Sequence, residues 1–350
     1  MSDLLSHETV TQRIIYTGPW SLHAWFRSSR PLNHLQQRRA GRAARILGRM
    51  ANEERDEHRK KRRVVTAFVH VVSLYCGGGY HDIPFETATA SVVLGVDNEK
   101  RMLECFEQFH PNAKTLNMTL SVSAVPDVLG AIRGCVPSNA RLHLNACLPC
   151  NYSSGTSGRR RHHITTEHVL ILFDIVEALK HEFSLTWFSE NIPAAAYVTP
   201  MRLLFPSAQH VVVCSSRFSY EKRKRAYFAS GPPMDLNELV GLTGGGTVQE
   251  CFSLRPNEYQ MKSGSTKYLA HEKSWRDVTG PAPTLTTNGL YLRRVDGTLH
   301  PWLVPGPALA RLRCLRAPPA NLPVVAQRQA VSRAVTGAVS RVVARQVCGT

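Results

Sequence analysis

Residues 64–97 read VVTAFVHVVSLYCGGGYHDIPFETATASVVLGVD. The β-branched run that ends at Tyr75 predicts a buried strand, and the glycines Gly77 to Gly79 predict a tight turn directly after it. We expect a helical segment at residues 85–89 and a second apolar strand at residues 92–96, which closes on Asp97. The stretch therefore predicts a β-α-β unit with parallel strands.

The same alternation continues along the chain. A helix is predicted at residues 100–109, and further strands and a longer helix are predicted at residues 142–144, 169–181, 186–188 and 211–214. Strands that alternate with helices imply parallel pairing with helices on both faces of the sheet. We therefore predict a Rossmann-like, doubly wound α/β sheet, followed by an irregular stretch at residues 231–280 and a return to helix at residues 324–347.

Composition limits the class of protein. The chain has 350 residues with 43% hydrophobic residues, which is enough to bury a full core and excludes disorder throughout. No run approaches the roughly eighteen apolar residues that a membrane span needs. The amino-terminal sequence lacks the features of a secretory signal, and the nine cysteines show no disulfide spacing. We expect an intracellular protein with reduced thiols.

Positive charge is concentrated near the amino terminus. The formal net charge is +17, and residues 1–63 alone hold 14 Lys and Arg against 6 Asp and Glu, a net +8. Such a charge favours a polyanionic partner. The cluster from Lys60 to Arg63 is compatible with nucleic-acid contact, with nuclear import, or with a solvated helix that has no partner. We expect the nucleus, or otherwise the cytoplasm, as the location.

A cofactor site is predicted at the end of the first two strands. Asp97 stands twenty positions after Gly77, so a glycine turn and an acid lie at the spacing of a Rossmann cofactor site. Glycine lets the backbone approach the ligand, and the acid accepts hydrogen bonds from ribose hydroxyls. The pattern predicts an adenosyl ligand and leaves a dinucleotide and S-adenosylmethionine both open.

A cysteine follows the next predicted strand. In HLNACLPCNYSS, residues 143–154, Cys150 comes just after the strand ends, at the edge of the sheet where ligands bind. Zinc binding by Cys147, Cys150, His162 and His163, a redox pair and ordinary buried thiols are the alternatives. Adjacent histidines lack the usual zinc-ligand spacing, which argues against zinc.

Two further segments carry charged groups at strand ends. Glu190 lies in SENIP, residues 189–193, directly after a predicted strand. Arg223 and Arg225 lie in YEKRKRAYF, residues 220–228, and point to the same face if that segment is extended. Paired arginines could clamp a phosphate or the carbonyl oxygen of a base.

In this order the motifs resemble those of the cytosine-5 DNA methyltransferases. The similar segments are SLYCGGGY (73–80), VVLGVD (92–97), LPCNYSS (148–154), SENIP (189–193), YEKRKRAYF (220–228), PAPTLTTN (281–288) and AVSRAV (330–335). The resemblance covers residues 64–347. It implies a basic amino-terminal segment (1–63), a catalytic domain (64–230), a target-recognition region (231–280) and a segment that returns to the catalytic domain (281–350).

The resemblance also implies roles for individual residues. Cys150 would be the nucleophile that adds to carbon-6 of cytosine, Glu190 would contact ring N3 and the exocyclic amine, and Arg225, supported by Arg223, would hold the carbonyl oxygen. The implied cofactor is S-adenosylmethionine, held by Tyr75, Gly77, Gly78, Gly79, Asp97, Asn117 and Pro149.

The implied partner is DNA with its target base flipped out of the duplex. The predicted nucleic-acid contacts are Ser153, Ser154, Arg159, Lys262 and Lys267. RNA, as in the tRNA-methylating branch of the family, and a non-enzymatic nucleic-acid-binding relative are the alternatives. We expect a monomer with no metal and no membrane association.

Several positions depart from the family pattern. Tyr75 stands in place of a phenylalanine, Asn117 in place of an acid and Asn151 in place of a glutamine. Glu221 replaces the glutamine that precedes the paired arginines. Ser332 and Arg333 replace a glycine–asparagine pair near the carboxyl terminus.

Overall fold

The computed structural model describes residues 68–150, 162–255, 257–263, 275–285, 289–296 and 302–349. The chain divides into two compact units, and the second, Val65–Thr350, contains all of these residues. The predicted basic segment 1–63 and the predicted contacts Ser153, Ser154, Arg159 and Lys267 lie outside the described residues.

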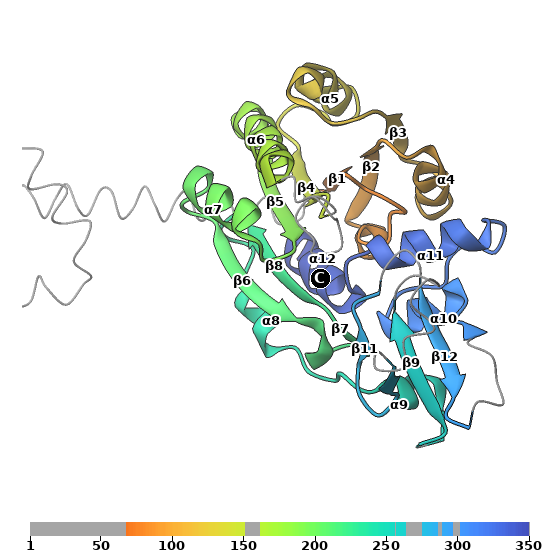
Figure 1. Cartoon of the computed structure of the whole chain (residues 1–350). Helices are drawn as coiled ribbons and strands as arrows, with labels where there is room; N and C mark the ends of the chain where they lie inside the picture. Colours follow the sequence, from red (N-terminus) through yellow and green to blue (C-terminus); the bar gives the residue numbers. More distant parts are fainter. Residues whose placement is uncertain are drawn as a thin grey trace, which may run out of the picture. The chain divides into compact units, whose positions relative to one another are not determined.

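A seven-stranded sheet forms the centre of this unit (Figure 1). Its order is β3 (Lys114–Asn117), β2 (Ala90–Asp97), β1 (Val69–Leu74), β4 (Arg141–Cys147), β5 (Ser184–Asn191), β8 (Lys224–Ala229) and β6 (Gln209–Cys214). The first five strands pair in parallel, whereas β8 runs antiparallel to both of its neighbours. The strand order reverses between β1 and β4, as in a doubly wound sheet. The prediction of a Rossmann-like α/β fold is confirmed.

Helices follow the parallel strands as expected. They are α4 (Lys100–Phe109), α5 (Val125–Arg133), α6 (His162–Leu179) and α7 (Ala195–Leu204). Residues of α5, α6 and α7 form a continuous apolar core with one face of the sheet, around Leu74, Leu144 and Ile175. The predicted helix at residues 100–109 is confirmed.

The helix expected at residues 85–89 is wrong. The connection from β1 to β2 holds only the short 3₁₀ turn η2 (Ile83–Phe85), with Pro84 in it, and the chain then closes on itself through the Thr87–Ala90 bridge. The carboxyl-terminal helix α12 (Gly337–Cys348) packs on η2 instead, and its residue Val343 shares an apolar core with Val71 of β1. A segment from the far end of the chain therefore covers this face of the sheet (Figure 1).

Residues 259–303 contribute the strands of a smaller, antiparallel sheet. Its order is β10 (Arg276–Asp277), β9 (Tyr259–Ser263), β12 (Leu290–Arg294) and β13 (Trp302–Leu303). The helices α9 (Val248–Phe252) and α10 (Gly306–Leu312) share its apolar core, whereas α8 (Asn237–Gly241) contacts β6 of the central sheet. Strands on both sides of Gly280 form the small sheet, so it does not end at the sequence boundary drawn there.

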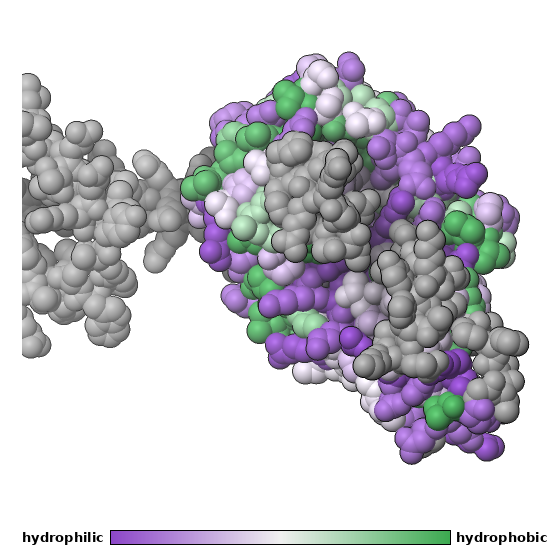
Figure 2. Space-filling model, viewed as in Figure 1, coloured by the Kyte–Doolittle hydropathy of each residue, from purple (hydrophilic) through white to green (hydrophobic). Residues whose placement is uncertain are grey.

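Two features connect this sheet to the central one. The short strands β7 (Glu221–Lys222) and β11 (Ala282–Pro283) pair in parallel, and helix α11 (Val324–Arg333) packs on both α4 and α10. The predicted helical character of residues 324–347 is confirmed, but as two helices that are separated by Ala334–Thr336. The visible face of the molecule is mainly hydrophilic, with apolar residues in separate small patches (Figure 2). No helix of the described ranges is long and apolar enough to span a bilayer.

Candidate active site

The carboxyl ends of the parallel strands bring the predicted site residues to one edge of the sheet. Asp97 is the last residue of β2, Glu190 is the second last of β5, and Cys150 follows the end of β4. The neighbouring strands β1 and β4 flank the point where the strand order reverses, which is where doubly wound sheets bind ligands. The fold therefore gathers groups that lie far apart in sequence.

The Asp97 carboxylate is held by two backbone N–H groups. The amide of Gly77 donates to Oδ2 at 2.9 Å and that of Glu99 donates to Oδ1 at 2.9 Å. Burial raises the pKa of Asp97, and these N–H groups and the charge of Arg333 only partly oppose that effect. Gly77 has φ +51°, and a Cβ there would meet no atom within 4 Å, so the turn faces open space beside the carboxylate.

The other two glycines of the turn pack against helices. A Cβ at Gly78 would lie 2.9 Å from the Cβ of Ala330 in α11, and one at Gly79 would lie 2.8 Å from the ring of Phe106 in α4. Gly79 also has φ +76°, a conformation that favours glycine. Close contact with α4 and α11 thus accounts for Gly78 and Gly79, whereas Gly77 is the position open to a ligand.

Tyr75 and Asn117 lie at the same edge. Asn117 pairs in register with Asp97, is exposed, and its amide donates to the Asp97 carbonyl at 3.5 Å. The Tyr75 hydroxyl forms a 2.9 Å hydrogen bond with Nδ1 of His168 in α6, and the two rings meet edge to face. The hydroxyl that a phenylalanine would lack thus ties the end of β1 to α6.

The buried imidazole of His110 contacts the backbone of the glycine turn. Nε2 of His110 donates to the Gly79 carbonyl at 3.0 Å, and Nδ1 contacts the Glu86 carboxylate at 2.7 Å. The two nitrogens both face acceptors, so the protonated ring satisfies both contacts. Burial alone would lower the pKa of His110, but Glu86, Asp82 and the Gly79 carbonyl outweigh burial and raise it.

The stability conferred by His110 should therefore depend on pH. Because the pKa is raised in the folded state, the contribution is full below the ordinary value of about 6.5 and is lost as pH rises through the folded value. Urea unfolding of wild type and His110→Gln should differ by about 1.5–3 kcal/mol at mildly acidic pH, the range of a hydrogen bond to a charged group. The difference should shrink in alkaline buffer, and a difference independent of pH would contradict this account.

Two cysteines, Cys147 at the end of β4 and Cys150 three residues later, lie in different surroundings. Burial, together with the charges of Glu190 and Asp82, raises the pKa of Cys147 well above its ordinary value. The charge of Arg223 also acts on Cys147, whereas Cys150 interacts electrostatically with both Arg223 and Arg225. Cys150, which interacts with both arginines, therefore remains the candidate nucleophile predicted from the sequence.

Glu190 and the two arginines form a buried cluster. Arg223 Nη2 donates to Glu190 Oε1 at 3.2 Å, and Arg225 Nε makes a 2.8 Å ion pair with the same oxygen, without the alignment of a hydrogen bond. All three residues are at most 6% exposed. Both arginines contact one carboxylate, in agreement with the prediction that they share a face.

Asn191 fixes the loop that carries the cysteine. Its amide donates to the Leu148 carbonyl at 3.2 Å, and its side-chain oxygen accepts from the Ile192 amide at 2.7 Å. Asn191 is fully buried. The residue after Glu190 therefore connects the end of β5 to the segment Leu148–Cys150, which includes Pro149.

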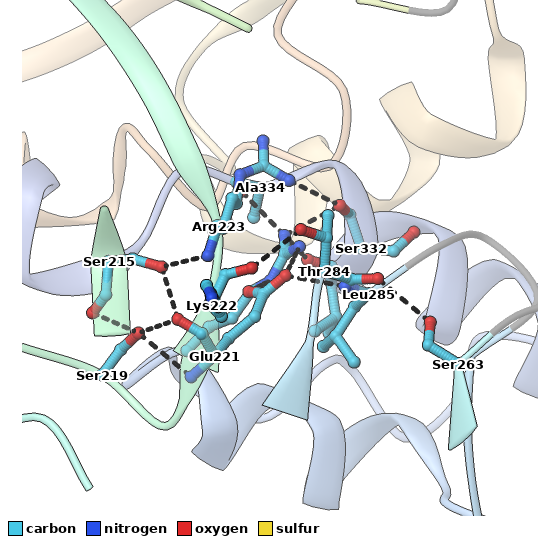
Figure 3. Close-up of polar contacts among 12 residues, drawn as sticks. Ser215, Ser219, Glu221, Lys222, Arg223, Ser263, Thr284, Leu285, Ser332 and Ala334 are labelled. Atoms are coloured by element: carbon cyan, nitrogen blue, oxygen red, sulfur yellow. Dashed lines mark hydrogen bonds and ion pairs between the residues drawn. The ribbon is translucent and has the colours of Figure 1, made fainter. Parts of the chain in front are cut away.

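A second buried ion pair, between Glu221 and Arg313, interacts with the first cluster through the charge of Arg223. Arg313 contacts both carboxylate oxygens of Glu221, with Nε 2.5 Å from Oε2 and Nη2 2.9 Å from Oε1, and both residues are fully buried. Burial favours the neutral acid, but Arg313 and Arg223 outweigh it, so the pKa of Glu221 is lowered. The Leu285 amide also donates to Glu221 Oε1 at 2.7 Å. Figure 3 shows Glu221 beside Arg223 and Ser332.

The departure at Ser332 and Arg333 places charge next to Asp97. Arg333 forms an ion pair with Glu99, two residues after Asp97, and its charge acts on the Asp97 carboxylate. The Ser332 carbonyl accepts hydrogen bonds from both Arg313 and Arg223. The end of α11 therefore contacts the glycine–acid edge and the arginine cluster together.

The remaining predicted residues are only partly placed. Lys262 is 5% exposed, with its ammonium group 5.7 Å from the ring centroid of Trp275, so its role as a phosphate contact stays a prediction. Within the described ranges no group of three or more His, Cys, Asp and Glu could hold a metal ion. Three residues that contact residues of the predicted motifs, His110, His168 and Arg313, were not predicted from the sequence, because each is isolated and belongs to no motif.

Comparisons with known proteins support the fold. No protein-family model and no curated protein matches the sequence. An E. coli prophage protein named as a DNA modification methyltransferase matches with a TM-score of 0.54 and 13% identity over 79% of this chain and 98% of its own. The S. pombe Dnmt2 methyltransferase matches with a TM-score of 0.54 and 12% identity over 79% and 96%. The Entamoeba histolytica methyltransferase EhMeth matches with a TM-score of 0.53 and 9% identity over 80% and 98%. The chain has the fold of these methyltransferases.

Proposed function

We propose that this protein is an S-adenosylmethionine-dependent methyltransferase that modifies carbon-5 of cytosine in DNA. The observation that carries the proposal is the cluster of Glu190, Arg223 and Arg225 with Cys150 in electrostatic range, at the ligand edge of a methyltransferase-like sheet. A cysteine, a carboxylate and a guanidinium are the groups that addition to a cytosine ring needs.

The residues at the ends of β1 and β2 fit S-adenosylmethionine. Gly77 leaves open space next to the Asp97 carboxylate, which can accept from ribose hydroxyls, and the Tyr75 ring and exposed Asn117 lie at the same edge. When bound, this cofactor supplies an electrophilic methyl group. The chain would hold it through these residues and through the backbone next to Pro149.

The chain's own residues would act on the base. The Cys150 thiolate adds to carbon-6, which makes carbon-5 electron-rich, and a guanidinium of the arginine pair holds the carbonyl oxygen as negative charge develops. Glu190 contacts ring N3 and the exocyclic amine. After carbon-5 gains the methyl group it loses its proton to solvent water, the electron pair of that C–H bond re-forms the double bond between carbon-5 and carbon-6, and the bond from sulfur to carbon-6 breaks to restore the thiolate. The target base must leave the duplex to reach Cys150.

Methyl transfer from labelled S-adenosylmethionine tests this function. DNA, tRNA and a nucleic acid that lacks cytosine serve as acceptors, with Cys150→Ser and Glu190→Gln as control variants. Label in DNA that depends on both residues supports the proposal, and label in tRNA alone would assign the RNA substrate instead. Binding of DNA without transfer to any acceptor would favour a non-enzymatic nucleic-acid-binding protein.

Cofactor binding offers a separate prediction. Asp97→Asn keeps the shape of the side chain but removes the charge and one of its acceptor oxygens, so it should weaken S-adenosylmethionine binding by about 10–100-fold, the effect of losing a charged hydrogen bond. Isothermal titration calorimetry measures the change. Glu107→Gln, on the exposed face of α4, is the matched control and should bind as wild type does. Equal affinity of Asp97→Asn and wild type would remove Asp97 from the site.

A further inference from the structure

Glu221 adds a charge to the cluster that the family's glutamine would not carry. It is fully buried and acts on the charge of Arg223, which also pairs with Glu190. Burial of an unpaired carboxylate destabilises the folded protein, so such a carboxylate pairs with the nearest cation. Without another partner Glu221 would therefore compete with Glu190 and with the Cys150 thiolate for Arg223.

Arg313 supplies that partner. Its guanidinium contacts both oxygens of Glu221, and its Nη1 donates to the carbonyls of Val331 at 2.7 Å, Ser332 at 2.8 Å and Ala334 at 2.9 Å. The Ser332 carbonyl also accepts from Arg223 Nη1 at 3.3 Å. Arg313 thus fixes two groups next to Arg223, one charged and one neutral.

The buried cluster carries a net positive charge. Three buried arginines, Arg223, Arg225 and Arg313, face two buried glutamates, Glu190 and Glu221, which leaves one positive charge in excess. A thiolate at Cys150, within electrostatic range of Arg223 and Arg225, would neutralise that excess. Removal of the Arg313 charge alone would make the cluster neutral before any thiolate forms.

We infer that Arg313 is a positioning residue that keeps Arg223 paired with Glu190, within electrostatic range of Cys150, by neutralising Glu221 and by fixing the Ser332 carbonyl. The role in catalysis rests on the proposed methyltransferase function, whereas the effect on Cys150 does not. The pair Glu221–Arg313 replaces a neutral side chain with a matched acid and base, so removal of the Arg313 charge should be tolerated only when the Glu221 charge is removed with it.

Thiol alkylation of the intact protein tests this inference. Wild type, Glu221→Gln, Arg313→Met and the double variant are treated with iodoacetamide at neutral pH, and the labelling of Cys150 is followed by peptide mass spectrometry. In Arg313→Met, iodoacetamide should label Cys150 about tenfold more slowly than in wild type. That is the change expected for one lost charge interaction of about 1.4 kcal/mol. Glu221→Gln should be no slower than wild type, and the double variant should return to within about threefold of it.

The direction of the change separates positioning from loss of structure. Local unfolding would expose thiols and accelerate labelling, and the buried Cys76 and Cys105 report such unfolding in the same digest. Labelling of Cys150 in Arg313→Met at or above the wild-type rate, with Cys76 and Cys105 still protected, would overturn the inference. So would a double variant as slow as Arg313→Met. Absence of methyl transfer by wild type would count against the proposed function and would leave this result intact.

Discussion

Cys150→Ser is expected to abolish covalent capture of an oligonucleotide that contains 5-fluorocytosine. Wild type should add its thiolate to carbon-6 and transfer the methyl group, after which carbon-5 carries fluorine and has no proton to lose. Release of the thiolate is then blocked, and the protein stays attached to the nucleic acid through a denaturing gel. Serine is a far weaker nucleophile at neutral pH, so capture should fall by at least about a thousandfold.

Cys147→Ser is the matched control for this experiment. Cys147 lies three residues earlier at the end of β4, but burial and the charge of Glu190 keep its thiol protonated. The variant should therefore capture the oligonucleotide as wild type does. Capture by Cys150→Ser that is lost in Cys147→Ser would move the nucleophile to Cys147, and capture by neither wild type nor Cys147→Ser would remove covalent addition from the mechanism.

The second large effect concerns stability. Arg313→Met leaves the Glu221 carboxylate buried without its partner and removes the donors to three carbonyls at the end of α11. Loss of one member of a buried ion pair costs about 3–5 kcal/mol. That is a large part of the total stability of a typical domain, about 5–15 kcal/mol. Urea unfolding followed by circular dichroism should show the loss directly.

The double variant Glu221→Gln with Arg313→Met should recover part of this loss. The glutamine introduced by Glu221→Gln would still accept from the Leu285 amide, and no charge would remain buried without a partner. The carbonyls of Val331, Ser332 and Ala334 would stay without Arg313, so recovery should be incomplete. A double variant less stable than Arg313→Met would show that the charge of Glu221 is not the main cost.

The sequence predicted the fold because the pattern of apolar strands is local and strong. The alternation of apolar strands with helices, and the positions of Asp97 and Glu190 at strand ends, could be identified without a structure. Parallel strands end at one edge, so topology alone brought these residues together. The helix at residues 85–89 was wrong because its place on the sheet is filled by α12, and a local pattern contains no information about so distant a segment.

The residues that support the site from outside, Arg313 and His110, are brought to it by contacts between distant parts of the chain. Arg313 lies 92 residues from Glu221 in the chain, and His110 lies 31 from Gly79. Nothing in the sequence around Arg313 distinguishes it from its exposed neighbour Arg311. The departure at Glu221 was visible as an unexpected acid, but its buried partner could be found only once the chain was folded.

The use of α12 in place of a helix between β1 and β2 has a consequence for biosynthesis. While the chain emerges from the ribosome, β1, β2 and β4 can pair, yet the apolar cluster that contains Val71 and Val92 stays incomplete until Val339 and Val343 have been made. Such long-range contacts slow folding and prolong the exposure of apolar strands. The nascent chain should therefore be more prone to aggregation before α12 has been synthesised than after it.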